Sequence, residues 1–278
     1  MSRICAQVAL AAALISTLLI PACQGNTQQL PYNGTYGFNV ILENNPGAVD
    51  PTWEQVVAFL KSDRTDEMDY VEGDFMCGSF AQDVHNNAEK AGIRAAWVGI
   101  DLAGEPVGHA VNAFNTTDRG LVFTDSTGRT ALERKMDLQK LEAEADSGSV
   151  SVTGGDRVAY VEKGRELGFI SLSVNPSPDY AYYEKYRSKS RDFEAKVAGF
   201  NQKVGAYNAE VGEFNQWVHG RTFIVGSSEA NRLAEWKGRL QMSLYLLKEE
   251  AAGLDKKKAE LGPVWEPMGT TSGIDARW

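Results

Sequence analysis

The stretch FMCGSFAQDVHNNAEKAGIRAAWV, residues 75–98, reads as a helix followed by a strand. Its apolar residues recur at helical spacing, at Phe80, Ala81, Val84 and Ala88. Ala91 and Gly92 end the periodic run, and the apolar segment IRAAWVGIDL, residues 93–102, is typical of a strand. We therefore predict a helix from about Cys77 to Lys90 that carries a cysteine in its first turn.

Further strands follow this helix at short intervals. We predict them at HAVNAFN (109–115), GLVFTDS (120–126), DRVAYVEKG (156–164) and GFISLSV (168–174). An earlier helix is predicted to run to about Lys61, with Asp50 as its cap and Pro51 in its first turn, and a short helix is predicted near 131–144. This pattern predicts an α+β domain over residues 51–175.

Residues 178–262 differ from this domain because their apolar residues follow a heptad repeat. The first seam comprises Phe193, Val197, Phe200, Val204, Tyr207, Val211, Phe214 and Val218, and the second comprises Leu233, Trp236, Leu240, Leu247, Leu254 and Leu261. We predict a long antiparallel coiled-coil hairpin with arms of about 50 Å. The alternative is a seam that packs against the preceding domain. In the tail, residues 263–278, Trp265 and Trp278 are expected to return to a domain surface.

The N-terminus reads as an export signal. Arg3 precedes an apolar run from Val8 to Ile20, which is shorter than the roughly 20 residues that a membrane span needs. The segment IPAC, residues 20–23, resembles a bacterial lipobox. We predict a signal peptide over residues 1–22, a lipid on Cys23, a tether over residues 23–50 that ends in a short strand at YGFNVIL (36–42), and an exported protein anchored to the membrane. The alternatives are secretion after cleavage near Ala22 and an uncleaved anchor.

Composition and charge exclude several function classes. The formal net charge of −9, with no basic stripe, argues against a nucleic-acid binder. The sequence carries no phosphate loop, no dinucleotide fingerprint and no paired Cys/His spacing typical of a metal site. We therefore expect no cofactor and no metal.

Cys77 is then expected to be the one free thiol of the mature protein. Cys5 leaves with the signal peptide and Cys23 carries the lipid, so Cys77 has no partner in an oxidising compartment. A helix N-terminus favours a thiolate, which is the nucleophilic form of cysteine. Two alternatives stay open: a small buried apolar residue, or a disulfide with an unlipidated Cys23.

A nucleophilic cysteine needs a base, and the chain has three histidines. His85 lies eight residues further along the same helix, about 12 Å up the axis, so it cannot reach Cys77. His85 and His219 are expected to be solvated surface residues. His109 opens a predicted strand and is the remaining candidate.

The base in turn needs an orienting group. If the strands 109–115 and 120–126 pair symmetrically about residue 117, His109 faces Asp125. Opposed residues on one face have Cβ atoms about 5 Å apart, so the carboxylate reaches the imidazole. A slip of one residue would put Asp125 on the other face.

Residues 70–130 resemble the transglutaminase-like superfamily of papain-like folds. The resemblance rests on the segments CGSFAQDVHNNAEKAGIRAAWV, GHAVNAF and GLVFTD in that order. It implies Cys77 as nucleophile, His109 as general base and Asp125 as orienting residue, on a helix packed against an antiparallel sheet. The lipobox and the hairpin are similar to those of prokaryotic lipoproteins with this domain. Tyr70 and the Cys77 backbone N–H are candidate oxyanion donors.

The expected function is cysteine-dependent acyl transfer on amide bonds of a protein or peptide, as a thiol protease, an amidase or a transglutaminase. The alternative is an inactive envelope lipoprotein that binds partners or self-associates through its coiled-coil hairpin.

Overall fold

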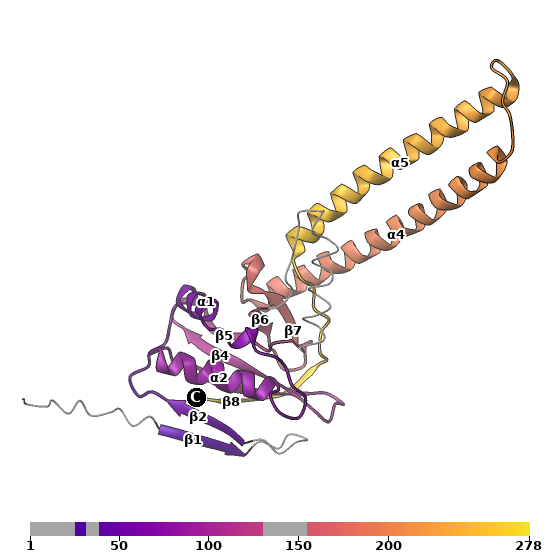
Figure 1. Ribbon diagram of the computed structural model, residues 1–278. Coiled ribbons are helices and arrows are strands. Elements are labelled where there is room, and N and C mark those ends of the chain that lie inside the picture. The colour runs from indigo at the N-terminus through magenta and orange to yellow at the C-terminus, as the bar shows by residue number, and fades with distance from the viewer. Residues whose placement is uncertain (1–25, 32–38, 130–154) are drawn as a thin grey trace, which may run out of the picture.

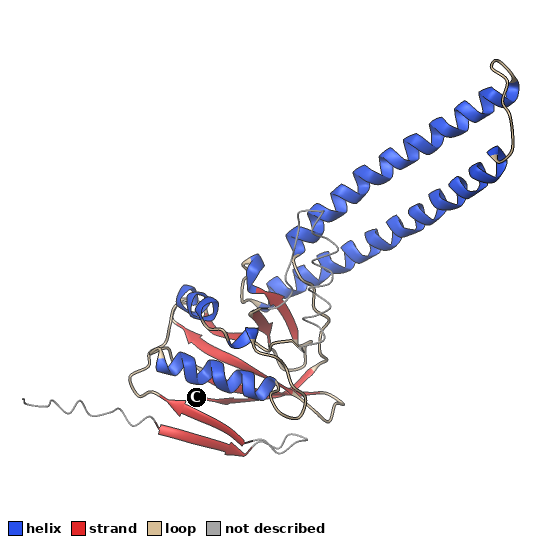
Figure 2. Cartoon of the chain, in the orientation of Figure 1, coloured by secondary structure: helices blue, strands red, loops and turns tan. Residues whose placement is uncertain are grey.

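The computed structural model describes residues 26–31, 39–129 and 155–278, and its fold is α+β, as predicted (Figure 1). The strands and two shorter helices form a globular part, from which two long helices project as a hairpin (Figure 2). In chain order the described elements are β1 (Asn26–Pro31), β2 (Asn39–Asn44), α1 (Trp53–Ser62), the 3₁₀ turn η1 (Thr65–Glu67), α2 (Cys77–Lys90), β3 (Ala96–Leu102), β4 (His109–Thr116), β5 (Gly120–Asp125), β6 (Arg157–Tyr160), β7 (Gly168–Ser171), the 3₁₀ turn η3 (Leu172–Val174), α4 (Tyr180–Val218), α5 (Ser228–Leu261) and β8 (Thr271–Arg277).

The main sheet has six antiparallel strands in the order β7-β6-β5-β4-β3-β8. Because side chains alternate along a strand, the sheet has an apolar core on each face. One core joins α1, α2 and the start of α4 to the sheet through residues such as Leu60, Val84, Phe114 and Tyr183. The other lies among the strands themselves, and Trp265 packs against it from the C-terminal segment.

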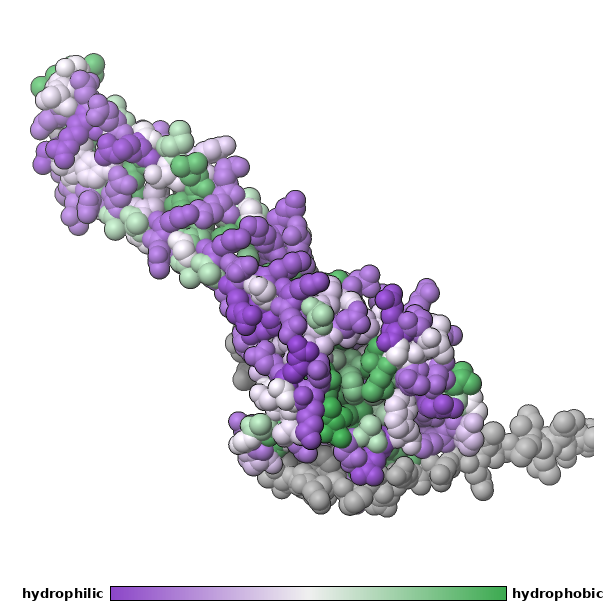
Figure 3. All heavy atoms as spheres, turned by 180° about the vertical axis from the view of Figure 1, so that it is seen from behind, coloured by the Kyte–Doolittle hydropathy of each residue, from purple (hydrophilic) through white to green (hydrophobic). Residues whose placement is uncertain are grey.

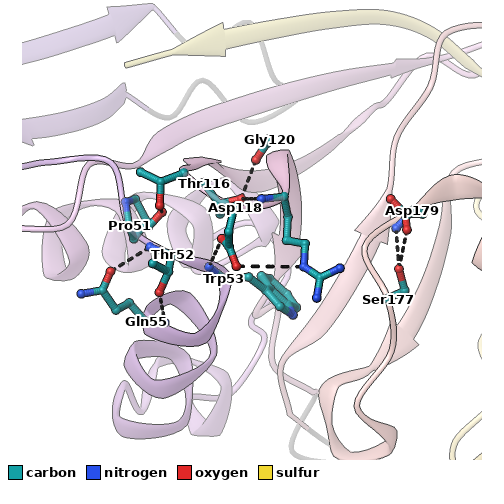
Figure 4. A network of polar contacts seen from close by, with 11 residues as sticks. Pro51, Thr52, Trp53, Gln55, Thr116, Asp118, Gly120, Ser177 and Asp179 are labelled. Carbon is teal, nitrogen blue, oxygen red and sulfur yellow. Dashed lines mark hydrogen bonds and ion pairs between the residues drawn. The ribbon is translucent and has the colours of Figure 1, made fainter.

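α1 begins at Trp53, and Thr52 rather than Asp50 is its N-cap. The hydroxyl of Thr52 accepts from the N–H of Gln55, and the side chain of Gln55 accepts from the N–H of Thr52, which is a complete capping box. The carboxylate of Asp118, in the β4–β5 turn, accepts from the N–H of Trp53 at 2.7 Å (Figure 4). This contact ties α1 to the turn between the two strands that carry the predicted histidine and aspartate.

The globular part extends beyond the predicted limits of residues 51 and 175. β2 lies within the predicted tether, yet it packs along α2 with Val40 and Leu42 buried. β8 lies within the predicted tail and joins the sheet beside β3. Trp265 returns to the globular part as expected, and Trp278 accepts a hydrogen bond from Asn44 at 3.0 Å through its carbonyl. Both ends of the described chain therefore belong to the same body as the sheet.

α4 and α5 pack against each other along the predicted seams, which argues against a seam that packs on the sheet domain. The residues of both seams are half-buried or buried, whereas most residues between them are exposed. Phe214 of α4 contacts Trp236 of α5 with ring centroids 5.4 Å apart, and Lys203 pairs with Glu250 at 2.7 Å. Each seam therefore covers the other helix.

The surface of the hairpin is mostly hydrophilic, with scattered apolar residues (Figure 3). Ile224 and Val225 lie in the loop between its helices, and both are exposed. Within the described part of the chain, no helix has the length and apolarity needed to cross a membrane. The predicted signal peptide, Cys23 and the helix near 131–144 lie outside the described residues.

Candidate active site

α2 places Cys77 at the edge of a cleft and holds it relative to the sheet. Cys77 is the first residue of the helix, as predicted, and its thiol is free. Two buried side chains of the sheet bind the first turns of α2. Trp97 Nε1 donates to the carbonyl of Gly78 at 3.1 Å, and Asn112 Nδ2 donates to the carbonyl of Ala81 at 2.7 Å. These bonds fix the thiol relative to β3 and β4.

His109 is the first residue of β4 and lies close to Asp125. The predicted register, in which the two face each other directly, is wrong by two residues. Asn112 pairs with Thr124, so the turn is centred one residue further along the chain and Asp125 comes opposite Val111. A shift of two leaves the alternation of side chains unchanged. Both side chains therefore share one face, and His109 Nε2 lies 3.2 Å from Asp125 Oδ2.

Cys77 and His109 both line one cleft, and each shifts the pKa of the other. Because Nε2 of His109 faces Asp125, Nδ1 is the ring nitrogen left for the thiol. Burial raises the pKa of Cys77, but the hydrogen bond and charge of His109 and the N–H of Ala110 outweigh it, so the pKa lies below its ordinary value. Burial lowers the pKa of His109, yet Asp125 and the thiolate raise it to about 10. The pair favours thiolate and imidazolium.

Asp125 is 1% exposed and has three polar neighbours. Its Oδ2 lies near His109 and 3.0 Å from a guanidinium nitrogen of Arg157, and its Oδ1 accepts from the N–H of Thr127 at 2.8 Å. Burial raises the pKa of Asp125, but the charges of Arg157 and His109 outweigh it and hold the pKa well below its usual range. Asp125 therefore stays ionised and acts as a hydrogen-bond acceptor for the imidazole.

These residues open onto a cleft of about 700 Å³. It is lined by Tyr70, Glu72, Met76, Cys77, Leu102, Glu105, Val107, Gly108, His109, Asp125, Thr127, Gly128, Arg157, Phe169, Trp265, Glu266 and Met268. Its volume falls within the range of small-molecule sites. A substrate group in this cleft can therefore reach the thiol.

The first turn of α2 also offers stabilisation for an anion beside Cys77. The first N–H groups of a helix have no intrahelical acceptor, and the positive end of the helix dipole lies there. Tyr70 lines the same cleft, with its ring stacked 6.4 Å from that of Phe80. Its role as an oxyanion donor stays a prediction.

The other two histidines lie away from this pair. His219 is exposed at the end of α4, as predicted. The expectation of a solvated His85 is wrong, because the side chain is fully buried and its Nδ1 lies 2.9 Å from Asn86 Oδ1. Val40 and Leu42 of β2 pack on the face of α2 that carries Ala81, and His85 lies one turn further along the same face.

Three residues of the site were not predicted from the sequence. Arg157 and Asn112 were recognised only as members of strands, and Trp265 only as a residue that returns to a surface. A buried arginine in a strand is a signal for an acidic partner, because a buried charge is costly unless it is paired. The sequence does not say which acid that is.

The described residues include no group of three or more histidine, cysteine or acidic side chains arranged to hold a metal ion. No family model, curated protein or solved structure matches this chain.

Proposed function

We propose that this chain is a cysteine-dependent acyl-transfer enzyme that acts on amide bonds of proteins or peptides. The observation that carries the proposal is the arrangement of Cys77 at a helix N-terminus, in one cleft with His109, which in turn is bonded to Asp125. The three side chains come from three different elements and meet at one cleft. Nucleophile, base and orienting group in this order are what thiol acyl transfer needs.

In the first half of the proposed reaction, the Cys77 thiolate attacks the amide carbonyl and a C–S bond forms. The negative charge moves to the carbonyl oxygen, beside the first N–H groups of α2. The C–N bond then breaks. The proton that His109 took from the thiol passes to the leaving ammonia or amine, which leaves a thioester on Cys77.

In the second half, His109 takes a proton from water or from a primary amine, which attacks the thioester. The C–S bond breaks and the thiolate is restored. Asp125 keeps the imidazole oriented and stabilises its charged form throughout. Water as acceptor makes the chain a protease or amidase, and an amine makes it a transglutaminase.

The proposal includes a transglutaminase-like, papain-like core. A helix that begins with the cysteine, packs on an antiparallel sheet and precedes the strands of His109 and Asp125 supports it. The order of the three residues along the chain agrees with the resemblance of residues 70–130.

The pH dependence of Cys77 alkylation by iodoacetamide tests the activated thiol. We expect an apparent pKa well below the reference of about 8.5, and a return toward that reference in His109→Ala. Cys77→Ala supplies the background from the other cysteines. A wild-type pKa near the reference, or a profile that His109→Ala leaves unchanged, contradicts the proposed function.

The acceptor is identified with a glutamine-containing peptide and a fluorescent primary amine. Incorporation of the amine that Cys77→Ala abolishes indicates a transglutaminase. Ammonia release or peptide cleavage without incorporation indicates a hydrolase. If neither product forms under conditions in which Cys77 is alkylated rapidly, amide substrates of this kind are excluded.

We also propose that the enzyme works outside the cytoplasm, anchored by lipid on Cys23. The support is the lipobox-like segment at residues 20–23. Labelled palmitate should be incorporated in a bacterial host and lost in Cys23→Ser. Equal labelling of both proteins contradicts the anchor.

The second candidate function is a catalytically inactive envelope protein that binds partners through its hairpin. The exposed apolar residues of the hairpin, such as Ile224, Val225 and Leu246, favour it. The alkylation profile separates the two, because a binding module does not need a thiol activated by His109.

A further inference from the structure

Arg157 extends the site beyond the three predicted residues. It lies directly opposite Asp125 in the β5–β6 pair, and one guanidinium nitrogen bonds both Asp125 Oδ2 at 3.0 Å and the carbonyl of Thr127 at 2.8 Å. The side chain is 9% exposed. The indole ring of Trp265 covers the guanidinium at 4.4 Å, and Phe169 lies 5.5 Å away.

The segment that carries Trp265 is held on both sides of this residue. Before it, Tyr186 donates to the carbonyl of Pro263 at 3.2 Å, and Val264 bridges to β7. After it, the N–H of Met268 donates to the carbonyl of Leu167 at 3.0 Å. The segment starts directly after α5 and leads to β8, so the indole is fixed between the hairpin and the sheet.

Arg157 also balances the charge of the buried cluster. With thiolate and imidazolium present, Cys77 and Asp125 are negative while His109 and Arg157 are positive. Removing the guanidinium leaves two negative groups against one positive group in a site shielded from water. The added negative potential disfavours the thiolate, because like charges nearby favour the protonated form of an acid.

We propose that Arg157, held in place by Trp265, is a positioning residue that fixes the Asp125 carboxylate for His109 and supports the thiolate of Cys77. This inference rests on the proposed function, since it concerns the same thiol. Arg157 acts through Asp125 and His109 and touches no reacting atom. Because the indole of Trp265 holds Arg157, the position of the guanidinium depends on the segment that follows the hairpin.

The test is the pH profile of Cys77 alkylation in the full chain. For Arg157→Met we expect the apparent pKa to rise by about one unit, which slows alkylation at a pH below the pKa about tenfold. Arg157→Lys keeps the charge and should recover most of the rate. Trp265→Leu loosens the guanidinium and should slow alkylation about threefold, a shift of about half a unit.

The matched control is Arg232→Met, which removes an arginine that lies 5.1 Å over the ring of Trp217 at the far end of the hairpin. This control should alkylate like the wild type, and circular dichroism should show all variants folded. Wild-type profiles in Arg157→Met and Trp265→Leu overturn the inference. If Arg157→Met does not fold, Trp265→Leu alone decides. If the apparent pKa of Cys77 in the wild type does not depend on His109, the result refutes the proposed function instead.

Discussion

Gly108 precedes His109, and replacing it with alanine should disturb the site without touching any of its reactive groups. A Cβ at this position would lie 2.1 Å from the carbonyl oxygen of Ile100, the residue that pairs with His109 in the β3–β4 ladder. Ordinary contact begins at 3.4 Å, so one backbone must move by about 1.3 Å. Neither strand is free at this point, because Ile100 also pairs with Ile274 of β8 on its other side.

This displacement acts where the imidazole is placed. A displaced imidazole supports the thiolate less, and a rise of about two units in the pKa of Cys77 lowers the thiolate fraction at a pH below that pKa about 100-fold. Overpacking costs about 1–3 kcal/mol of stability. We therefore expect Gly108→Ala to slow alkylation of Cys77 at pH 6 about 100-fold and to lower the free energy of unfolding by about 1–3 kcal/mol.

The assay is iodoacetamide kinetics, with urea unfolding of the same samples. The matched control is Gly238→Ala in α5, where a new Cβ would meet nothing within 4 Å. This control should gain about 0.5–1 kcal/mol of stability and keep the wild-type rate. Wild-type alkylation in a stable Gly108→Ala protein would refute the reasoning, because the strand start would then tolerate the methyl group without moving His109.

Three further predictions concern the buried polar groups. Asp125→Asn leaves the charge of Arg157 buried without its partner, so urea unfolding should show a loss of about 3–5 kcal/mol, and a loss below about 1 kcal/mol would contradict the pairing. In Cys77→Ser, the pKa of folded His109 stays above its unfolded value of about 6.5. The charged imidazole therefore stabilises the fold fully below pH 6.5, and this stabilisation is lost as the pH rises through the folded pKa, which is about 10 in the wild type. The free energy of unfolding of Cys77→Ser should therefore fall across this interval, and the fall should vanish when His109→Gln is added. Asn112→Leu removes the bond to the carbonyl of Ala81 and should cost about 1–3 kcal/mol, measured by urea unfolding, with slower alkylation of Cys77; unchanged values would show that this bond does not hold α2.

The elements with a strong period could be predicted from the sequence. The predicted bounds of α2, Cys77 and Lys90, are those of the structure, and the heptad repeats predicted the two facing seams of the hairpin. Such patterns are local, because a helix repeats every 3.6 residues whatever it packs against. The prediction of Asp50 as the N-cap of α1 was wrong. Thr52 is the cap because Gln55 completes the capping box.

The candidate site was predictable in part for the same reason. Cys77 and His109 each begin an element, and strand alternation kept Asp125 on the face of His109 although the register was shifted by two. The face on which a side chain lies alternates from residue to residue, so it can be read from the sequence. The register between two strands depends instead on the geometry of the turn that joins them.

By itself, then, the sequence determined the α-helices and most strands of the described residues, the hairpin and the three residue types of the candidate site. Only the tertiary structure decided that Arg157 pairs with Asp125 and that Trp265 covers Arg157. These contacts join β5, β6 and the segment after α5, which are far apart along the chain. Their pairing depends on the packing of the whole sheet, and no local period records it.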